Sequence, residues 1–280
     1  MSRCAIDLHN HSCLSPCGDL AMSPSLLARK AKARGIDILG LSDHNAAHNS
    51  LPFALSCAQE GIAPLFGLEL CSVEEVHLLA IFPSPRRALE FGRTILGHLP
   101  RFPGTEGKFG DQAVVDDEEN VLALEETWFG AALYLGFGDL ADLAKSVRAL
   151  VIPAHVDRPM FSVHSQLGFL PPGPYDAIEA VRPPIPDFLA KGHSVIAGSD
   201  AHYPEHIGRR PWILDIPEGL LEALNCRLAE FSVQAEALRP EDEAYRGYDG
   251  LLEDPRLDAY PEEEALALFE ALRAALKSGA

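Results

Sequence analysis

The sequence predicts an α/β barrel, a ring of parallel strands in which helices connect successive strands. Seven short apolar runs alternate, over most of the chain, with segments of helical pattern. Each run borders a histidine or carboxylate residue, as strands do at the catalytic rim of such a barrel. The 280 residues suffice for one barrel of roughly 250 residues. The runs are Cys4–Leu8, Asp37–Leu41, Ile62–Phe66, His77–Phe82, Leu150–Pro153, Ala177–Ile178 and Ser194–Ala197.

The first elements alternate regularly. After strand Cys4–Leu8 and a Gly/Pro-rich loop, Ser23 caps a helix that ends at Gly35. Strand Asp37–Leu41 and helix Ser50–Glu60 follow. The sequence therefore predicts two strand–helix units in succession.

The third and fourth strands interrupt this alternation of strands and helices. Only the turn Cys71–Val76 separates Ile62–Phe66 from His77–Phe82, which is too short for a crossover helix. These two strands either pair as a hairpin or mark a distortion of the barrel.

An insertion is predicted at about residues 100–130, after helix Pro85–Leu99. Its apolar segments Gln112–Val115 and Val121–Leu124 flank the acidic tip Asp116–Asn120. This pattern is typical of a β-hairpin.

The alternation resumes with helix Asp139–Ala149 and the strand after it. A Pro-rich loop with Gly168–Pro174, the helix Pro186–Lys191 and the helix Glu218–Glu230 complete a barrel domain of residues 1–235.

Residues 236–280 are predicted to lie outside this domain. Pro240–Pro261 is acidic and Pro-punctuated, which indicates a linker or a loosely packed arm. Glu262–Lys277 predicts a C-terminal helix with acidic residues first and basic residues last, as the helix dipole favours. Its apolar stripe packs on the barrel or on a partner chain, so an oligomer through this helix is one alternative.

Charge and hydropathy narrow the class of protein. The net charge is −18 and we find no basic patch, which argues against long nucleic acid as a ligand. No apolar run approaches the roughly 20 residues that span a bilayer, and a strand pattern begins almost at the N-terminus, which leaves no room for a signal peptide. We expect a cytoplasmic protein with no membrane contact. Small anionic substrates remain compatible, because bound metal ions reverse the local field.

The strand ends predict a metal site. His9 and His11 follow the first strand at i and i+2, so both imidazoles point the same way and can reach one ion. The pair alone is a weak signal, but six of the eleven histidines recur at strand ends. Imidazole with carboxylate is the ligand set of zinc, manganese and iron.

Several motifs, in this order, resemble those of the PHP (polymerase and histidinol phosphatase) superfamily. The resemblance covers about residues 4–215. The motifs are Asp7-Leu-His-Asn-His-Ser12, Ser15-Pro-Cys-Gly-Asp-Leu-Ala-Met-Ser-Pro24, Leu41-Ser-Asp-His-Asn45, Gly67-Leu-Glu69, Glu75-Val-His77, Pro153-Ala-His155 and Gly198-Ser-Asp-Ala-His202.

The resemblance implies a distorted seven-stranded (β/α)7 barrel with three divalent metal ions, zinc, manganese or iron. It places His9, His11 and Asp200 on one ion, with Glu69 as a bridge to a second. It gives His77 and His155 to the second ion, and Asp19, His44 and His202 to the third.

Some roles stay open at the level of sequence. Asp19 lies in a long loop and either binds the third ion or caps that loop. Arg158, three residues after His155, either contacts a substrate phosphate, as the resemblance implies, or pairs with a neighbouring carboxylate. Asp7 and Asp43 precede ligands and are expected to orient imidazoles, whereas Glu179 is equally well explained as a strand-end charge.

The resemblance implies a phosphoesterase that hydrolyses a small phosphate ester, such as a nucleotide or histidinol phosphate, by metal-activated hydroxide. Glu69 and Arg158 would be its catalytic residues. One alternative is another metallohydrolase of amidohydrolase type, although no lysine stands at a strand end to bridge metals. The other is a non-catalytic PHP regulatory module, although such modules are expected to lose ligands.

Overall fold

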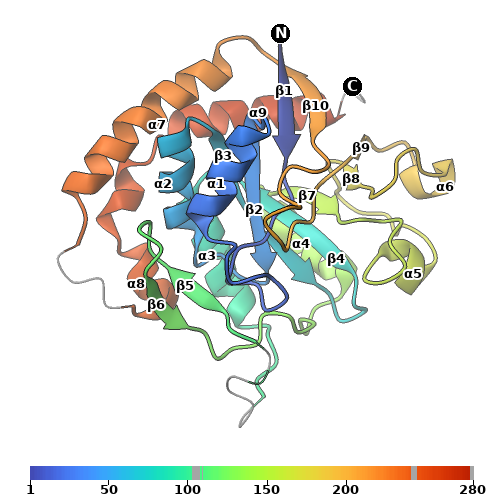
Figure 1. The fold of residues 1–280 in the computed structure, drawn as a ribbon. Coiled ribbons are helices and arrows are strands. Elements are labelled where there is room, and N and C mark those ends of the chain that lie inside the picture. Colours follow the sequence, from blue (N-terminus) through green and yellow to red (C-terminus); the bar gives the residue numbers. More distant parts are fainter. Residues whose placement is uncertain (103–107, 109, 241–244, 278–280) are drawn as a thin grey trace.

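The protein is described by a computed structural model, which covers residues 1–102, 108, 110–240 and 245–277 (Figure 1). One sheet has six strands in the order β10-β1-β2-β3-β4-β7. Its members are β10 (Trp212–Ile216), β1 (Ser2–Asp7), β2 (Ile38–His44), β3 (Ala63–Cys71), β4 (His77–Phe82) and β7 (Leu150–Pro153). The sheet curls strongly and forms about half of a barrel.

A short parallel pair, β8 (Ile178–Glu179) and β9 (Val195–Ile196), forms a separate two-stranded sheet between β7 and the end of β1. On one side the amide of Asp176 donates to the carbonyl of Val151 in β7 at 2.9 Å. On the other, a parallel bridge joins Asn10 to Ala201. The seven predicted strands therefore all form, and the fold is the distorted barrel that the sequence predicts.

The β3–β4 connection decides between the two alternatives for the third and fourth predicted strands, a hairpin or a distortion of the barrel. β4 pairs antiparallel with β3, with Cys71 opposite His77, and antiparallel with β7. The hairpin interpretation is confirmed, because the turn is too short to return the chain in parallel.

β10 was not predicted. It pairs antiparallel with β1 from Ser2 to Ile6 and so occupies the edge of β1 that would otherwise close the barrel. β10 runs antiparallel to β1, with Ile216 opposite Ser2, so it ends at the rim opposite the one that carries the ligand-type residues.

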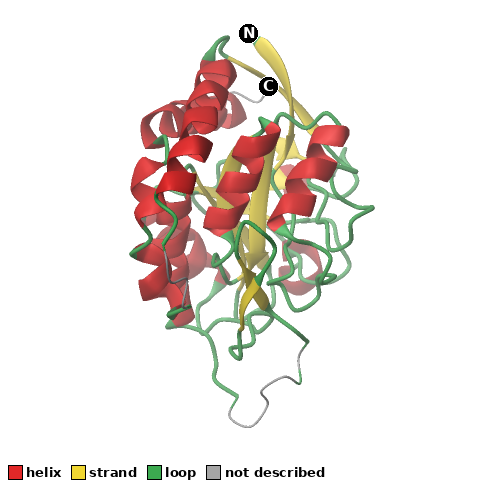
Figure 2. Ribbon diagram, turned by 60° about the vertical axis from the view of Figure 1, so that its left-hand side comes forward, coloured by secondary structure: helices red, strands yellow, loops and turns green. Residues whose placement is uncertain are grey.

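Helices cover the sheet much as predicted (Figure 2). The side chain of Ser23 accepts from the amide of Leu26 at the start of α1, and Gly61 ends α2 at a left-handed φ of 64°. A short α5 lies in the segment expected to be a Pro-rich loop, and α7 runs seven residues beyond Glu230. The helices are α1 (Pro24–Ala33), α2 (Ser50–Glu60), α3 (Pro85–Leu96), α4 (Phe137–Ser146), α5 (Val163–Leu167), α6 (Asp187–Ala190) and α7 (Leu220–Ala237).

The inserted hairpin forms from β5 (Ala113–Val115) and β6 (Val121–Leu124). Buried Asn49 fixes it, because its amide donates to the carbonyl of Ala113 at 3.1 Å and accepts from the amide of Val115 at 3.1 Å. Asn49 also donates to the hydroxyl of Ser12 at 3.0 Å, so the insertion is tied to the loop after β1.

The C-terminal segment packs more tightly than a linker. Residues 245–261 contain α8 (Gly247–Leu252) and the 3-10 helix η1 (Pro255–Ala259), and Tyr248 and Tyr260 are buried. The expectation of a loose arm is wrong for these residues, because buried aromatic rings anchor them to the barrel.

The last helix, α9 (Glu262–Lys277), contacts α7 and β10 of its own chain and buries Leu268, Phe269, Leu272 and Leu276. The domain boundary at residue 235 and any association through α9 remain predictions. Among the described residues, none of the helices is both long and apolar enough to cross a membrane.

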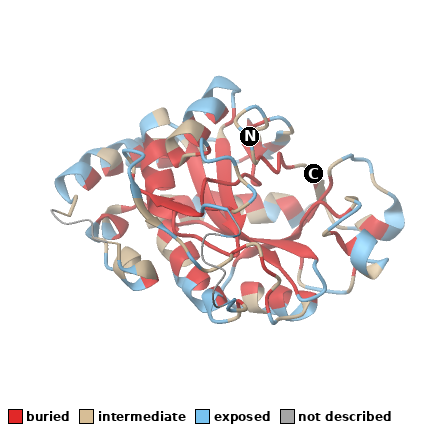
Figure 3. Ribbon diagram, turned by 60° about the horizontal axis from the view of Figure 1, so that its bottom comes forward, coloured by how far each residue is buried: buried red, intermediate tan, exposed pale blue. Residues whose placement is uncertain are grey.

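The core lies between the sheet and these helices. β2, β3 and β4 are buried along their whole length, as Figure 3 shows for the central strands. Histidine and carboxylate side chains at the ends of such strands are therefore surrounded by apolar protein and held rigidly.

Candidate metal centre

β1 delivers two imidazoles to one point. Beyond its end the chain stays extended, and the amide of His11 donates to the carbonyl of Ala201 at 3.0 Å. The Nε2 atoms of His9 and His11 lie 3.3 Å apart, and both side chains are fully buried. Two ligand atoms about 2.1 Å from one ion are separated by roughly this distance. The geometry therefore suits two ligands of a single ion.

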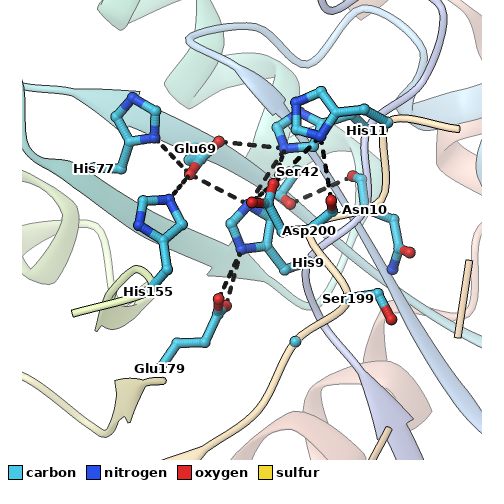
Figure 4. A network of polar contacts seen from close by, with 12 residues as sticks. His9, Asn10, His11, Ser42, Glu69, His77, His155, Glu179, Ser199 and Asp200 are labelled. Carbon is cyan, nitrogen blue, oxygen red and sulfur yellow. Dashed lines mark hydrogen bonds and ion pairs between the residues drawn. The ribbon is translucent and has the colours of Figure 1, made fainter. Parts of the chain in front are cut away.

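Glu69, at the end of β3, stands at the centre of the site (Figure 4). Its Oε1 atom lies 2.7 Å from Nδ1 of His77, 2.9 Å from Nε2 of His155 and 3.3 Å from Nε2 of His9. Its Oε2 atom lies 3.1 Å from Nδ1 of His44 and 3.2 Å from Nε2 of His11. The two oxygens thus face different sets of imidazoles, as a carboxylate that bridges two ions does.

Strand register explains part of this arrangement. His44 stands directly opposite Glu69 in the β2–β3 ladder, so their side chains emerge on the same face of the sheet. His77 begins β4, opposite Cys71 in the antiparallel ladder. The pairing of β2, β3 and β4 therefore places three ligand-type residues, His44, Glu69 and His77, on the same face of the sheet.

Asp200 joins the cluster from the loop after β9. Its Oδ1 lies 3.5 Å from Nε2 of His11 and 3.6 Å from Nε2 of His9. Asp200 and His155 both have positive φ, 47° and 31°, a backbone region that few non-glycine residues adopt. Asp7 holds the chain before Asp200, because its carboxylate accepts from the amide of Ser199 at 2.9 Å.

Three groups of side chains have ligand atoms within 4.8 Å of one another. They are His9, His11, Glu69 and Asp200; His44, Glu69 and His77; and His11, His44 and His202. These groups share members, so they form one continuous cluster. Buried clusters of this composition are suited to more than one divalent metal ion.

Asp19 lies apart from these groups. Its side chain is exposed, and its carboxylate accepts from the amide of Ala21 at 2.8 Å, the loop-capping arrangement. Its own amide donates to the carbonyl of His202 at 2.9 Å, so the backbone of the loop, rather than the carboxylate, contacts the cluster.

A second layer of polar groups orients the imidazoles. Glu179 lies 2.9 Å from Nδ1 of His9, and Ser15 lies 3.0 Å from Nδ1 of His11. The hydroxyl of Ser15 in turn donates to Asp43 at 2.7 Å. Each contact occupies Nδ1 and leaves Nε2 free to bind an ion.

Of the carboxylates considered for orienting imidazoles, two do so and Asp7 does not. Asp43 orients His11 through Ser15, and Glu179 orients His9 directly. Asp7 instead contacts backbone amides, those of Ser199 and Gly208. Gly198 leaves room for Glu179, since a Cβ at this position would lie 2.7 Å from its carboxylate oxygen.

Charge within the cluster is strongly coupled. Burial opposes ionisation of Glu69, but His77, His9 and His44 outweigh it and hold the pKa of this carboxyl well below its usual range. Burial, together with the neighbouring His11, lowers the pKa of His202 to about 4. Burial and then the surrounding imidazoles lower the pKa of His44 as well. Imidazoles that stay neutral keep the lone pairs that metal binding needs.

Two buried carboxylate oxygens without a hydrogen-bond donor indicate whether metal ions fit this cluster. Among the described residues, Oε2 of Glu69 and Oδ1 of Asp200 are buried and have no hydrogen-bond donor. Buried carboxylate oxygens rarely lack a partner. Both oxygens belong to the His9 and His11 group, where a divalent ion would satisfy them. The residues present therefore fit metal ions.

A cavity of about 360 Å³ opens above the cluster. The ligand-type residues His44, His77, Asp200 and His202 form part of its lining. Arg158 lies in its wall, with Nη1 2.8 Å from Oδ2 of Asp200. This ion pair is the second of the two roles considered for Arg158, pairing with a neighbouring carboxylate. The side chain is nevertheless 35% exposed and borders the cavity.

Four other residues in this wall were not among the predicted site residues. They are Cys17, Phe161, Tyr203 and Arg209. Tyr203 and Arg209 follow the last motif within seven residues, a proximity that could have indicated them. Cys17 lies in the loop after His11, and its side chain is exposed. His206, which lies between Tyr203 and Arg209, lines the cavity too.

A protein-family model described as the PHP domain matches residues 7–128. This chain carries a PHP domain. The matched range includes the ligand-type residues in or just after β1–β4, and the structure adds the ligand-type residues His155, Asp200 and His202 from beyond it. The PHP resemblance of the motifs is thereby confirmed.

Solved structures show the same fold over nearly the whole chain. The lesion-specific endonuclease EndoQ from Pyrococcus furiosus matches with a TM-score of 0.60 and 16% identity, over 90% of this chain and 71% of the endonuclease. An Endonuclease Q complex with a 27-mer duplex containing an abasic lesion matches with a TM-score of 0.56 and 18% identity, over 82% of this chain. This chain spans 57% of that second protein. A search among curated proteins found no match.

Proposed function

We propose that this PHP-domain protein is a metal-dependent phosphoesterase that hydrolyses a small phosphate ester at a trinuclear site. The observation that carries the proposal is Glu69, a fully enclosed carboxylate whose two oxygens face separate sets of imidazoles. In this position the Glu69 carboxylate would be a shared ligand of two neighbouring ions. Closely spaced divalent ions lower the pKa of bound water and neutralise phosphoryl oxygens.

The proposed ligands are those that the PHP resemblance implies. His9, His11, Glu69 and Asp200 would hold the first ion, and Glu69, His77 and His155 the second. His44 and His202 would hold the third. Assigning Asp19 to this third ion requires its carboxylate to leave the amide of Ala21.

The other residues bind and orient. Glu179 and Ser15 would fix the rings of His9 and His11, so that Nε2 of each ring faces the ions. Arg158 would donate to the substrate phosphate from the cavity wall, as a planar guanidinium can do with two N–H groups. The cavity is wide enough for a whole small ester, which supports a small substrate.

Two alternatives are less well supported. Amidohydrolases of the kind considered use a carboxylated lysine or a glutamate as a bridge, and no lysine stands at the end of a ligand-bearing strand, so the carboxylated-lysine form has no support. A non-catalytic module would not need an open cavity over intact ligands. The two EndoQ structures are of a lesion-specific endonuclease and of a complex with a duplex that carries an abasic lesion, but the likeness of this chain to them is one of fold.

A substrate panel tests the proposal. Protein loaded with manganese or zinc is expected to hydrolyse p-nitrophenyl phosphate or bis(p-nitrophenyl) phosphate, and not p-nitroacetanilide. The two phosphate esters separate monoesterase from diesterase activity. Metal-loaded protein that cleaves the anilide and neither phosphate ester would replace the phosphoesterase with an amidohydrolase.

Arg158→Ala is expected to lower kcat/KM by tenfold to a hundredfold without removing metal. A charge-assisted hydrogen bond contributes roughly 1.5–3 kcal/mol, and tenfold corresponds to about 1.4 kcal/mol. Arg158→Lys should recover part of the loss, because a point charge cannot form the two-pronged contact. The measurements are kcat/KM and metal content on the same samples.

Arg182→Ala, an exposed arginine outside the cavity wall, is the matched control and should leave both quantities unchanged. If the loss in Arg158→Ala follows metal content, the arginine acts only through its ion pair with Asp200.

A further inference from the structure

The alcohol that leaves a phosphate ester needs a proton, and no residue assigned in the proposed function supplies one. An alkoxide leaves readily only when its charge is neutralised, most simply by a proton from a positioned side chain. The imidazoles and carboxylates of the three ligand groups are committed to metal ions. The proton donor therefore has to come from the rest of the cavity wall.

The chemistry of the wall narrows the choice. Among the described residues that line the cavity, five side chains outside the ligand groups carry an N–H, O–H or S–H group. Arginine side chains keep their protons in proteins. An ordinary thiol titrates at about 8.5 and a phenol at about 10, whereas imidazole titrates at about 6.5 and so suits proton transfer near neutral pH. The five are Cys17, Arg158, Tyr203, His206 and Arg209.

The ring of His206 is not engaged by the protein. Each imidazole of the three ligand groups lies 2.7–3.4 Å from a carboxylate oxygen. Within the described part of the chain, His206 has no carboxylate that close and no hydrogen bond to its ring, which meets only the ring of Tyr203, edge-on at 5.6 Å. Because His206 lines the cavity and is partly exposed, its ring nitrogens are available to a bound molecule.

The backbone around His206 is held in place. Arg34, just after α1, donates to the carbonyl of Glu205 at 2.8 Å and to that of Ile207, the residues on either side. The amide of His206 donates to the carbonyl of Tyr203 at 2.9 Å. A general acid has to stand within hydrogen-bond reach of the oxygen that it protonates. With its backbone fixed in the cavity wall, His206 needs only side-chain rotation to adjust this distance.

We propose that His206 is the general acid of this site and gives a ring N–H proton to the ester oxygen as the alcohol leaves. The inference rests on the proposed phosphoesterase function. In the step, an oxygen of water bonds to phosphorus, and the bond from phosphorus to the ester oxygen breaks with its electron pair going to that oxygen. His206 passes from imidazolium to neutral imidazole, and the proton released by the attacking water restores it.

The test compares p-nitrophenyl phosphate with p-nitrobenzyl phosphate on the metal-loaded protein. The two esters are similar in size, but p-nitrophenolate leaves as a stable anion, whereas the benzyl alkoxide needs a proton. His206→Gln keeps a polar side chain without a transferable proton, so it should lower kcat/KM for the benzyl ester by about 100-fold or more and for the phenyl ester by less than about threefold. If the wider panel identifies a diesterase, the methyl diesters of the same two alcohols are used.

Further variants assign the effect to proton transfer. Metal content, measured on the same samples, should be equal in His206→Gln and in the parent. His164→Gln, at an exposed histidine of α5 that does not line the cavity, is the matched control and should change neither ester. His206→Ala leaves space for a free base, so added imidazole should raise its kcat/KM for the benzyl ester and not for the phenyl ester.

The outcomes separate this inference from the proposed function. Equal losses on both esters in His206→Gln would make His206 a structural residue, and no loss on the benzyl ester would make it a solvated one; either result overturns the inference and leaves the phosphoesterase intact. A loss that follows metal content overturns it as well. If metal-loaded parent protein hydrolyses neither ester nor any ester of the wider panel, the proposed function fails and this inference falls with it.

Discussion

Replacing Glu69 by Gln is expected to lower phosphoester hydrolysis by more than about 1,000-fold, equivalent to about 4 kcal/mol of barrier. The amide is neutral, and its nitrogen would point an N–H donor at imidazoles that lie 2.7–3.3 Å from the present oxygens. Two proposed ions would lose their shared ligand and part of their charge balance. The measurements are kcat and the number of ions per chain.

The fold should survive this substitution, because Gln has nearly the shape of Glu and the strands around it are packed by apolar side chains. Circular dichroism of the metal-free variant should match that of the metal-free parent. Glu90→Gln, at an exposed position on α3, should change neither activity nor metal content. More than about a tenth of the parent activity in Glu69→Gln, under 1.4 kcal/mol of barrier, would show that Glu69 bridges nothing.

Metal removal is expected to have the second large effect. Purified protein should carry two to three ions per chain by plasma emission spectrometry, and chelation should reduce activity below about 1%. Ions that bind only the folded state at 1,000 times their dissociation constant stabilise it by roughly 4 kcal/mol. Chelation should therefore lower Tm by about 10 °C.

Adding manganese, zinc or iron one at a time to the stripped protein should restore activity and Tm together, and the metal that restores most identifies the native preference. His193→Ala, a histidine outside the three ligand groups, is a suitable control and should bind as many ions as the parent. Fewer than one ion per chain after reconstitution would contradict the trinuclear assignment.

Much of the site follows from local rules that can be applied to the sequence. Side chains alternate along a strand and parallel strands end at one rim, so His9, His44 and Glu69 could be placed together before their contacts were known. The third strand meeting the fourth in a hairpin also follows from the length of the turn. Helix boundaries followed capping residues, as at Ser23 and Gly61.

Loops were less predictable, because their conformation depends on contacts between distant segments. Asp19 had the right residue type and motif, yet its carboxylate caps its own loop. Arg158 pairs with Asp200, 42 residues away, and Asn49 fixes a hairpin more than 60 residues further along the chain. No periodicity in the sequence records such pairings.

The sequence by itself determined the strand-end residues and the family of the domain, since both depend on short segments whose period and order are visible in one dimension. Only the tertiary structure decided that the two oxygens of Glu69 face different sets of imidazoles, that β10 pairs with the free edge of β1, and that Phe161 and Tyr203 line the same cavity. These features arise where separate loops and strands pack against one another. Their geometry is set by the packing of the whole chain, which the local pattern does not contain.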